Sequence, residues 1–137
     1  MGKLGGREMT ASSDLDLTFI YEHHDTKITS DGESPLSVTE YYARLAKRLI
    51  AALSAMTSEG RLYDVDMRLR PSGAAGPIAL RLSSFLKYHL EEAWTWEHMA
   101  LLRARVIAGP EALTTQIEAV VDQVLTSPHN EKDLFVN

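Results

Sequence analysis

Apolar and polar residues alternate near the start of the chain, and this alternation constrains the fold most strongly. The stretch from Asp14 to Tyr21 reads DLDLTFIY. A period of two puts alternate side chains on opposite faces of a β-strand, so Asp14 and Asp16 point to the same side. An unpaired carboxylate on a half-buried sheet costs more free energy than a small domain can spare. The fold must therefore bring arginines or divalent cations to this face.

A second stretch further along the chain repeats the pattern. From Tyr63 to Pro71 the sequence is YDVDMRLRP. Proline has no N–H to give to a strand ladder, so Pro71 ends the run. We predict a second strand with one apolar and one charged face. The charged face carries Asp64, Asp66, Arg68 and Arg70.

The spacing of apolar residues predicts a long amphipathic helix between these two strands. In VTEYYARLAKRLIAALSAM, which begins at Val38, apolar residues recur at intervals of three and four. Ser37 or Thr39 can serve as the N-cap, and the helix is expected to end before Gly60. The side chains on its apolar face are Tyr42, Leu45, Leu49, Ala52, Leu53 and Met56.

The second half of the chain is predicted to be mainly helical. We expect a short strand over residues 78–82 and helices over 83–92, 94–108 and 111–125. Trp94 and Trp96 are predicted to lie in the helical core, although exposed tryptophans would instead mark an interface. These patterns predict an α+β fold, in which a small mixed sheet carries the acidic residues, helices pack on it, and a helical segment follows.

Composition limits the classes of partner. A protein that binds nucleic acid or a membrane surface through charge alone needs a basic face, and a net charge of −5 argues against both partners. The chain has no cysteine, which excludes disulfides and thiolate metal sites. No apolar run approaches the roughly 18 residues that a membrane span needs. We therefore expect a cytoplasmic protein.

Three carboxylates on two strands are typical of a magnesium site. Mg²⁺ prefers carboxylate oxygens and completes its shell with water and phosphate. Asp14 and Asp16 from one strand and Asp66 from the other can hold two ions roughly 3.5–4 Å apart. Asp66 can also accept a proton from an attacking hydroxyl. Two simpler interpretations stay open, namely a solvated end for the first strand and an Arg–Asp ladder along the second.

Three blocks of the sequence resemble a known enzyme family. They are GKLGGREMTASSDLDLTFIY, LYDVDMRLRPSGAAGP and AWTWEHMALLRARVIAG. A small-residue turn, a D-x-D strand and a distant third acidic strand, in that order, resemble the nucleotidyltransferase superfamily typified by DNA polymerase β. Within that superfamily, the blocks are similar to the catalytic core of the bacterial glutamine synthetase adenylyltransferases.

The resemblance implies a polymerase β-like fold and a set of site residues. Asp14 and Asp16 match the paired metal ligands, and Asp66 matches the third carboxylate. The backbone N–H groups of Gly5 and Gly6 would face the triphosphate of ATP, although a plain turn is the simpler interpretation of these glycines. The remaining candidates for the nucleotide site are Ser13, Arg68 and Arg70, of which the two arginines either contact phosphate or, as we favour, neutralise the acidic cluster.

The resemblance also implies a reaction. Family members are long chains with two such domains, one that attaches AMP from ATP to a tyrosine of glutamine synthetase and one that removes it by phosphorolysis, giving ADP. The PSGAAG and EAWTWEH segments are more similar to the adenylylating, C-terminal half. Glutamine synthetase and the PII signalling protein are the implied partners. The deadenylylating half and a non-catalytic module that docks partners through residues 94–105 remain alternatives.

We expect the chain to be a fragment of such a protein. The family's domain has a strand and helices before the glycine turn. Residues 1–109 are predicted to form the truncated catalytic core. Residues 110–137 are predicted to begin a C-terminal helical region that ends in a disordered tail.

Overall fold

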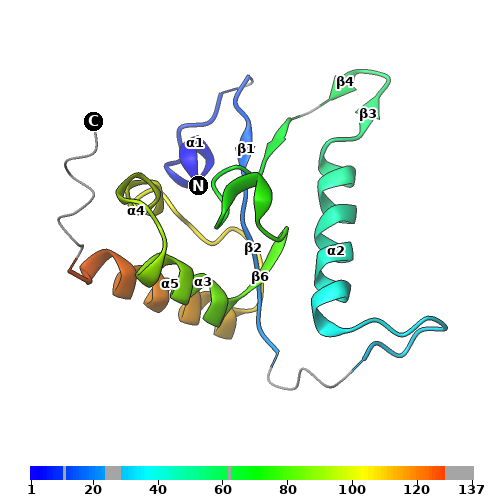
Figure 1. Ribbon diagram of the computed structural model, residues 1–137. Helices are drawn as coiled ribbons and strands as arrows, with labels where there is room; N and C mark the ends of the chain where they lie inside the picture. Colours follow the sequence, from blue (N-terminus) through cyan, green and yellow to red (C-terminus); the bar gives the residue numbers. More distant parts are fainter. Residues whose placement is uncertain (11, 24–28, 62, 129–137) are drawn as a thin grey trace.

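The computed structural model describes residues 1–10, 12–23, 29–61 and 63–128 (Figure 1). Residues 129–137, at the end of the region predicted to finish in a disordered tail, lie outside these described residues. In chain order the helices are α1 (Gly2–Gly5), α2 (Val38–Leu53), the 3-10 helix η1 (Gly73–Ala75), α3 (Leu82–Glu91), α4 (Thr95–Leu101) and α5 (Glu111–Thr126). The strands are β1 (Leu15–Asp16), β2 (Phe19–Tyr21), β3 (Met56–Thr57), β4 (Gly60–Arg61), β5 (Val65–Asp66) and β6 (Ala79–Arg81).

The strands pair in three short ladders. β1 pairs with β5 and β2 pairs with β6, both in parallel, whereas β3 and β4 form an antiparallel hairpin. Helices together with parallel and antiparallel strands confirm the predicted α+β class. The polymerase β-like topology stays a prediction.

The strand predicted over residues 15–21 is divided in two. β1 ends after the Leu17 N–H donates to the Asp66 carbonyl at 3.0 Å. Beyond Asp66 the chain of β5 bends away, and the Arg70 N–H donates to the Met67 carbonyl at 3.1 Å. Because its partner has turned aside, the first strand continues beside β6 instead. The result is one extended segment with two successive partners.

Apolar residues form a core on each side of the β2–β6 pair. On one side α2 packs through Val38 and Ala46 against Tyr21 and Ala79. The rings of Tyr21 and Tyr42 stack with centroids 4.5 Å apart. On the other side α3, α4 and α5 meet, and their buried side chains are Phe85, Leu101 and Val124. Figure 1 shows α2 on one flank of the central strands and α3 and α5 on the other.

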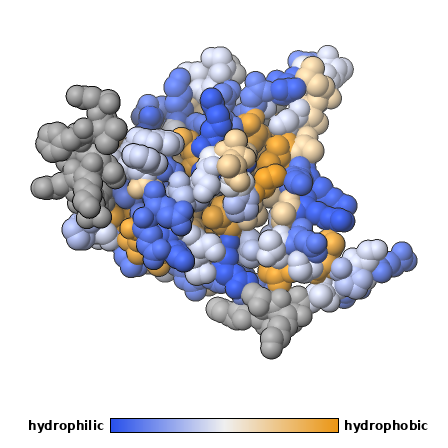
Figure 2. All heavy atoms as spheres, in the orientation of Figure 1, coloured by the Kyte–Doolittle hydropathy of each residue, from blue (hydrophilic) through white to orange (hydrophobic). Residues whose placement is uncertain are grey.

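Helix α2 begins as predicted but buries a different face. Ser37 is the N-cap: its hydroxyl accepts from the Glu40 N–H, and the Glu40 carboxylate accepts from the Ser37 N–H. The predicted apolar face is confirmed at Tyr42, which packs on the strands, and is wrong for its leucines and Met56. The helix contacts the strands through a valine, an alanine and a tyrosine, and the leucines turn aside from that contact. The exposed fractions are 51% for Leu45, 46% for Leu49, 36% for Leu53 and 70% for Met56, and Figure 2 shows hydrophobic surface reaching the outside beside α2.

Helix α4 is shorter than predicted. It ends at Leu101 instead of Ala108. The chain that follows passes so close to α1 that a Cβ atom on Gly5 would collide with the Arg103 carbonyl oxygen. The prediction that Trp94 and Trp96 lie in the core is wrong, because their exposed fractions are 54% and 55%. Helix α5 confirms the prediction for residues 111–125. Within the described residues, no helix has the length and apolar character to cross a membrane.

Candidate active site

The pairing of β1 with β5 brings two predicted carboxylates side by side. In this parallel ladder Leu15 is the partner of Val65 and Asp16 is the partner of Asp66. Register partners point to the same face, so both carboxylates lie on one side of the ladder. Asp16 and Asp66 are half-buried, whereas Asp14 is exposed at the entrance to β1. The two strands thus place a pair of negative charges at one edge of the molecule, with a third beside it.

Asp16 carries the least favourable charge of the three. Burial raises its pKa, and the charges of Asp66 and Asp14 raise it further. Its carboxylate lies so close to the backbone of α1 that a Cβ atom on Gly2 would collide with the Asp16 Oδ2 atom. A carboxylate with a raised pKa and two like charges nearby gains free energy from any added cation.

Arg68 is the cation that these carboxylates share. Its Nε donates to both oxygens of Asp66, at 3.1 and 2.9 Å, its Nη2 donates to Oδ2 at 2.6 Å, and its N–H donates to Oδ1 at 2.8 Å. These bonds lower the pKa of Asp66. They also raise the pKa of Arg68, which the charges of Asp14 and Asp16 raise further. The Arg68 side chain is 81% exposed, so this ion pair is screened by water and weak.

The three carboxylates match only part of what a magnesium site needs. Three carboxylates have the hard oxygens that Mg²⁺ requires. Within residues 1–10, 12–23, 29–61 and 63–128, however, no group of three or more His, Cys, Asp or Glu side chains is arranged to hold a metal ion. Asp16 and Asp66 are neighbours, but both oxygens of Asp66 are bonded to Arg68. The assignment of Asp14, Asp16 and Asp66 as metal ligands therefore stays a prediction.

The glycines predicted to cradle a triphosphate lie at the end of α1. The Gly5 N–H donates to the Met1 carbonyl and the Gly6 N–H donates to the Gly2 carbonyl, each at 3.0 Å. In this arrangement neither N–H is available to a phosphate. Their need for glycine has a different cause, since the chain around Arg103 passes too close for a side chain at Gly5.

Ser13 and Arg70 bond to the protein backbone or to nearby side chains. The buried Ser13 hydroxyl accepts from the Thr10 N–H at 3.0 Å and bonds the Thr10 hydroxyl at 2.9 Å, which fixes the loop that leads into β1. Arg70 was predicted to share the charged face with Asp66, but the structure directs it elsewhere. It donates to the carbonyl oxygens of Met67, Ala74 and Gly76 and so shapes the loop after β5.

Two arginines that the sequence did not single out lie beside this edge. Arg103 makes an ion pair with Glu8 at 2.8 Å. Arg105 donates to the carbonyl oxygen of Leu4 at 3.0 Å and to that of Gly5 at 3.4 Å. The only signal in the sequence was the block that contains both, AWTWEHMALLRARVIAG.

A partly buried hydrogen bond connects α3 to α4. The Tyr88 hydroxyl donates to a Glu97 oxygen at 2.7 Å, and the other Glu97 oxygen accepts from the Trp94 N–H at 2.8 Å. Burial raises the pKa of Tyr88. With Glu97 only 6% exposed, this pair fixes the angle between the two helices.

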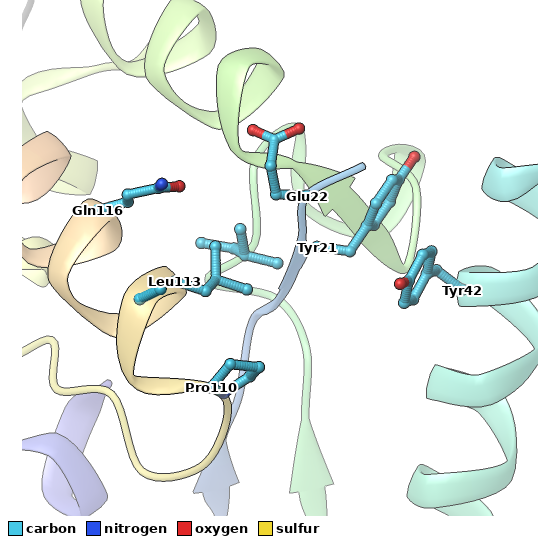
Figure 3. Close-up of a pocket in the computed structure, with 8 residues that line it drawn as sticks. Tyr21, Glu22, Tyr42, Pro110, Leu113 and Gln116 are labelled. Carbon is cyan, nitrogen blue, oxygen red and sulfur yellow. The ribbon is translucent and has the colours of Figure 1, made fainter. Parts of the chain in front are cut away.

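A pocket of about 370 Å³ lies elsewhere, between the end of β2 and the start of α5. Figure 3 shows Tyr21 and Tyr42 on one side and Pro110 and Leu113 on the other. Its lining is mainly apolar, and it contains none of the predicted site residues.

Comparison with known proteins identifies the family. A sequence profile described as "Glutamate-ammonia ligase adenylyltransferase" matches residues 1–120. A "Bifunctional glutamine synthetase adenylyltransferase/adenylyl-removing enzyme" of Brucella suis biovar 1 (strain 1330) is 55% identical over 134 residues, which is 98% of this chain and 14% of that protein. A protein of the same name in Rhizobium meliloti (strain 1021) is 56% identical over 126 residues, which is 92% of this chain and 13% of that protein. Another in Rhodopseudomonas palustris (strain TIE-1) is 58% identical over 130 residues, which is 95% of this chain and 13% of that protein.

The chain thus spans about one seventh of the length of the curated relatives that it matches, 13–14% of each. The match covers almost the whole length of the chain at more than half identity. The family resemblance of the three sequence blocks is therefore confirmed, and the chain belongs to the glutamate-ammonia ligase adenylyltransferase family.

Proposed function

We propose that this chain is a nucleotidyl-transfer domain that moves AMP from ATP to a tyrosine hydroxyl of glutamine synthetase. The observation that carries the proposal is the register of β1 and β5, which places Asp16 beside Asp66 with Asp14 near enough to raise the pKa of Asp16. A structural sheet edge gains nothing from three mutually repelling carboxylates. A site for a cationic or metal-bound substrate needs them.

Asp14, Asp16 and Asp66 would be the magnesium ligands, and Arg68 would give up Asp66 when the ion binds. Bound magnesium, for which two ions are proposed, would neutralise the negative charge that builds up on the reacting phosphate. The exposed Arg68 pair suits this exchange, because a screened ion pair is easily replaced by a stronger partner.

The chain's own residues would orient the substrates and accept a proton. The tyrosine oxygen forms a bond to the α-phosphorus of ATP, the bond from that phosphorus to the bridging oxygen breaks, and pyrophosphate leaves. The hydroxyl proton would pass to Asp66, which Arg68 keeps deprotonated in the free protein by lowering its pKa. A half-buried sheet edge holds these groups in position with little reorganisation.

The names of the relatives cover both adenylylation and removal of the adenylyl group. We propose the adenylylating direction, from the similarity of the PSGAAG and EAWTWEH segments noted above, and PII as a partner of the longer protein. With a net charge of −5, nucleic acid and membrane surfaces are not proposed as partners, and a cytoplasmic location is proposed.

The test is a mass measurement on the acceptor protein. The chain is incubated with glutamine synthetase, ATP and magnesium, and the intact mass of the synthetase subunit is recorded. Asp16→Asn and Asp66→Asn should abolish the addition of AMP. Asp64→Asn is the matched control, because Asp64 is an exposed aspartate on the same segment that pairs with Arg61 instead of the cluster.

The outcomes separate the candidates. Addition of AMP by the chain and the control, but not by the two variants, supports the proposal. Substantial transfer by Asp16→Asn would refute it. If nothing is added, adenylylated synthetase is offered with phosphate, and release of ADP would assign the chain to the removing half instead.

A further inference from the structure

We propose that Arg105, with Arg103 beside it, binds the terminal phosphates of the nucleotide. This inference rests on the proposed function and adds to it the residues that recognise the phosphate chain. The ligand class is a nucleoside 5′-triphosphate or diphosphate, or free pyrophosphate, that reaches past the carboxylates along α1.

The first reason is that the other donors predicted for phosphate are already bonded. The N–H groups of Gly5 and Gly6 are bonded inside α1. Arg70 is directed into its own loop. Arg68 is bonded to Asp66 and becomes available only when the proposed magnesium takes its place. A triphosphate carries several negative charges and would approach an edge that already holds three carboxylates. It needs cations of the protein in addition to any metal ion.

The second reason is the position of Arg105 relative to Asp16. Asp16 lies against Gly2 at the start of α1, and Arg105 donates to the carbonyl oxygens of Leu4 and Gly5 at its end. Four helical residues span about 6 Å. That distance is comparable to the reach of a triphosphate, so an α-phosphate beside Asp16 would leave the terminal phosphates near Arg105.

The third reason is the unused capacity of Arg105. A guanidinium has five N–H donors, and the two bonds to α1 leave the others available. Arg105 is exposed, and among the described residues it makes no ion pair with a carboxylate. Arg103 is held by Glu8, with 43% of its side chain exposed, and would have to leave that partner to contact phosphate. Arg105 is therefore the principal contact and Arg103 the secondary one.

The test compares ligands that share some phosphates and lack others. Binding of ATP, inorganic pyrophosphate and AMP to the 137-residue chain, each with magnesium, is measured by calorimetry. Arg105→Gln should weaken ATP and pyrophosphate by about tenfold to a hundredfold, the range of a charge-assisted hydrogen bond. AMP should bind as it does to the wild type, because it lacks the terminal phosphates.

Arg48→Gln is the matched control, since it removes the same charge from an exposed position on α2. It should leave all three affinities unchanged. Arg105→Lys keeps the charge and loses the forked geometry, so it should bind pyrophosphate with an affinity between those of the wild type and Arg105→Gln. If Arg105→Gln fails to fold, which thermal unfolding would reveal, Arg105→Lys decides: weaker pyrophosphate with unchanged AMP supports the inference, and no change in either overturns it.

The remaining outcomes separate this inference from the proposed function. Wild-type affinity of Arg105→Gln for ATP and pyrophosphate, with AMP transfer intact, overturns the inference alone. An equal loss of affinity for AMP overturns it too, because Arg105 would then support the whole site. A wild-type chain that binds none of the three ligands overturns both proposals.

Discussion

Replacement of Asp16 by asparagine should stabilise the metal-free chain while it abolishes AMP transfer. Burial and the charge of Asp66 raise the pKa of Asp16, so the folded chain holds this charge less well than the unfolded chain does. Asparagine keeps the shape of the side chain and removes the charge. The free energy of unfolding should therefore increase at neutral pH.

The spacing of the strands gives the magnitude. Neighbouring strands lie about 4.8 Å apart, and two unit charges at that distance repel each other by about 0.9 kcal/mol in bulk water. Burial of Asp16 adds to this cost, and the positive charges of the Met1 amine and of Arg68 offset part of it. We expect a gain of about 1 kcal/mol, which corresponds to an increase of roughly 3–4 °C in Tm for a chain of this size.

The assay is thermal unfolding followed by circular dichroism, at neutral pH with a chelator present. The gain should disappear below the ordinary aspartate pKa of 3.8, where both forms of the protein are uncharged at this position. Asp66→Asn should not stabilise the chain, because it loses the bonds to Arg68. An unchanged or lower Tm for Asp16→Asn at neutral pH would refute the electrostatic account of the site.

Three further predictions concern metal binding, the loss of stability at acid pH, and the packing of α1. Excess magnesium should raise the Tm of the wild type but not of Asp16→Asn; an equal rise in both, measured by the same assay, would place the cation elsewhere. Burial lowers the pKa of His89 to about 4. The free energy of unfolding, measured by urea titration, should therefore fall by at most roughly 3 kcal/mol as the pH falls from 6.5 to about 4. His89→Phe should remove most of this dependence on pH. Gly5→Ala should lower stability by about 1–3 kcal/mol through the collision with the Arg103 carbonyl, whereas Gly32→Ala, with open space around it, should have little effect; equal urea midpoints for the two would contradict the close approach.

Local patterns predicted the elements of the site well. Alternation predicted strands at Asp16 and Asp66, which lie in β1 and β5, whereas Asp14 lies just before β1. The N-cap pattern at Ser37 marked the start of α2, because such signals involve neighbours in the sequence. The order of the strands and their parallel pairing depend on contacts between distant segments. The meeting of these carboxylates was predicted from their chemistry, but the register that sets Asp16 beside Asp66 is seen only in the structure.

The roles of individual arginines were not predictable from the alternation. The alternation puts Arg68 and Arg70 on the same face of the predicted strand. Because the chain bends after β5, Arg68 contacts Asp66, whereas Arg70 donates to three loop carbonyls. Arg105 lies about one hundred residues from its partners in α1. A contact of that separation leaves no periodic signal, and only the three-dimensional structure shows it.

The exposed leucines of α2 provide a direct test between sequence pattern and structure. The pattern places Leu45 and Leu49 in the core, whereas the structure exposes 51% and 46% of these residues and buries Ala46 at 4%. If the leucines were covered, burial of each would contribute about 1.5–3 kcal/mol, and Leu45→Gln with Leu49→Gln would cost several kcal/mol. The structure instead predicts a change of about 0.5 kcal/mol or less for each substitution.

Ala46→Leu is the opposite case, because it forces a large side chain between α2 and the β2–β6 strands and should cost about 1–3 kcal/mol. Urea unfolding of the double glutamine variant and of Ala46→Leu decides whether α2 packs through the face that the sequence pattern predicts or the face that the structure shows. The structure requires Ala46→Leu to be the less stable protein. The reverse order would mean that the leucines are covered in solution, and that α2 packs on the strands through the face that the sequence pattern predicts.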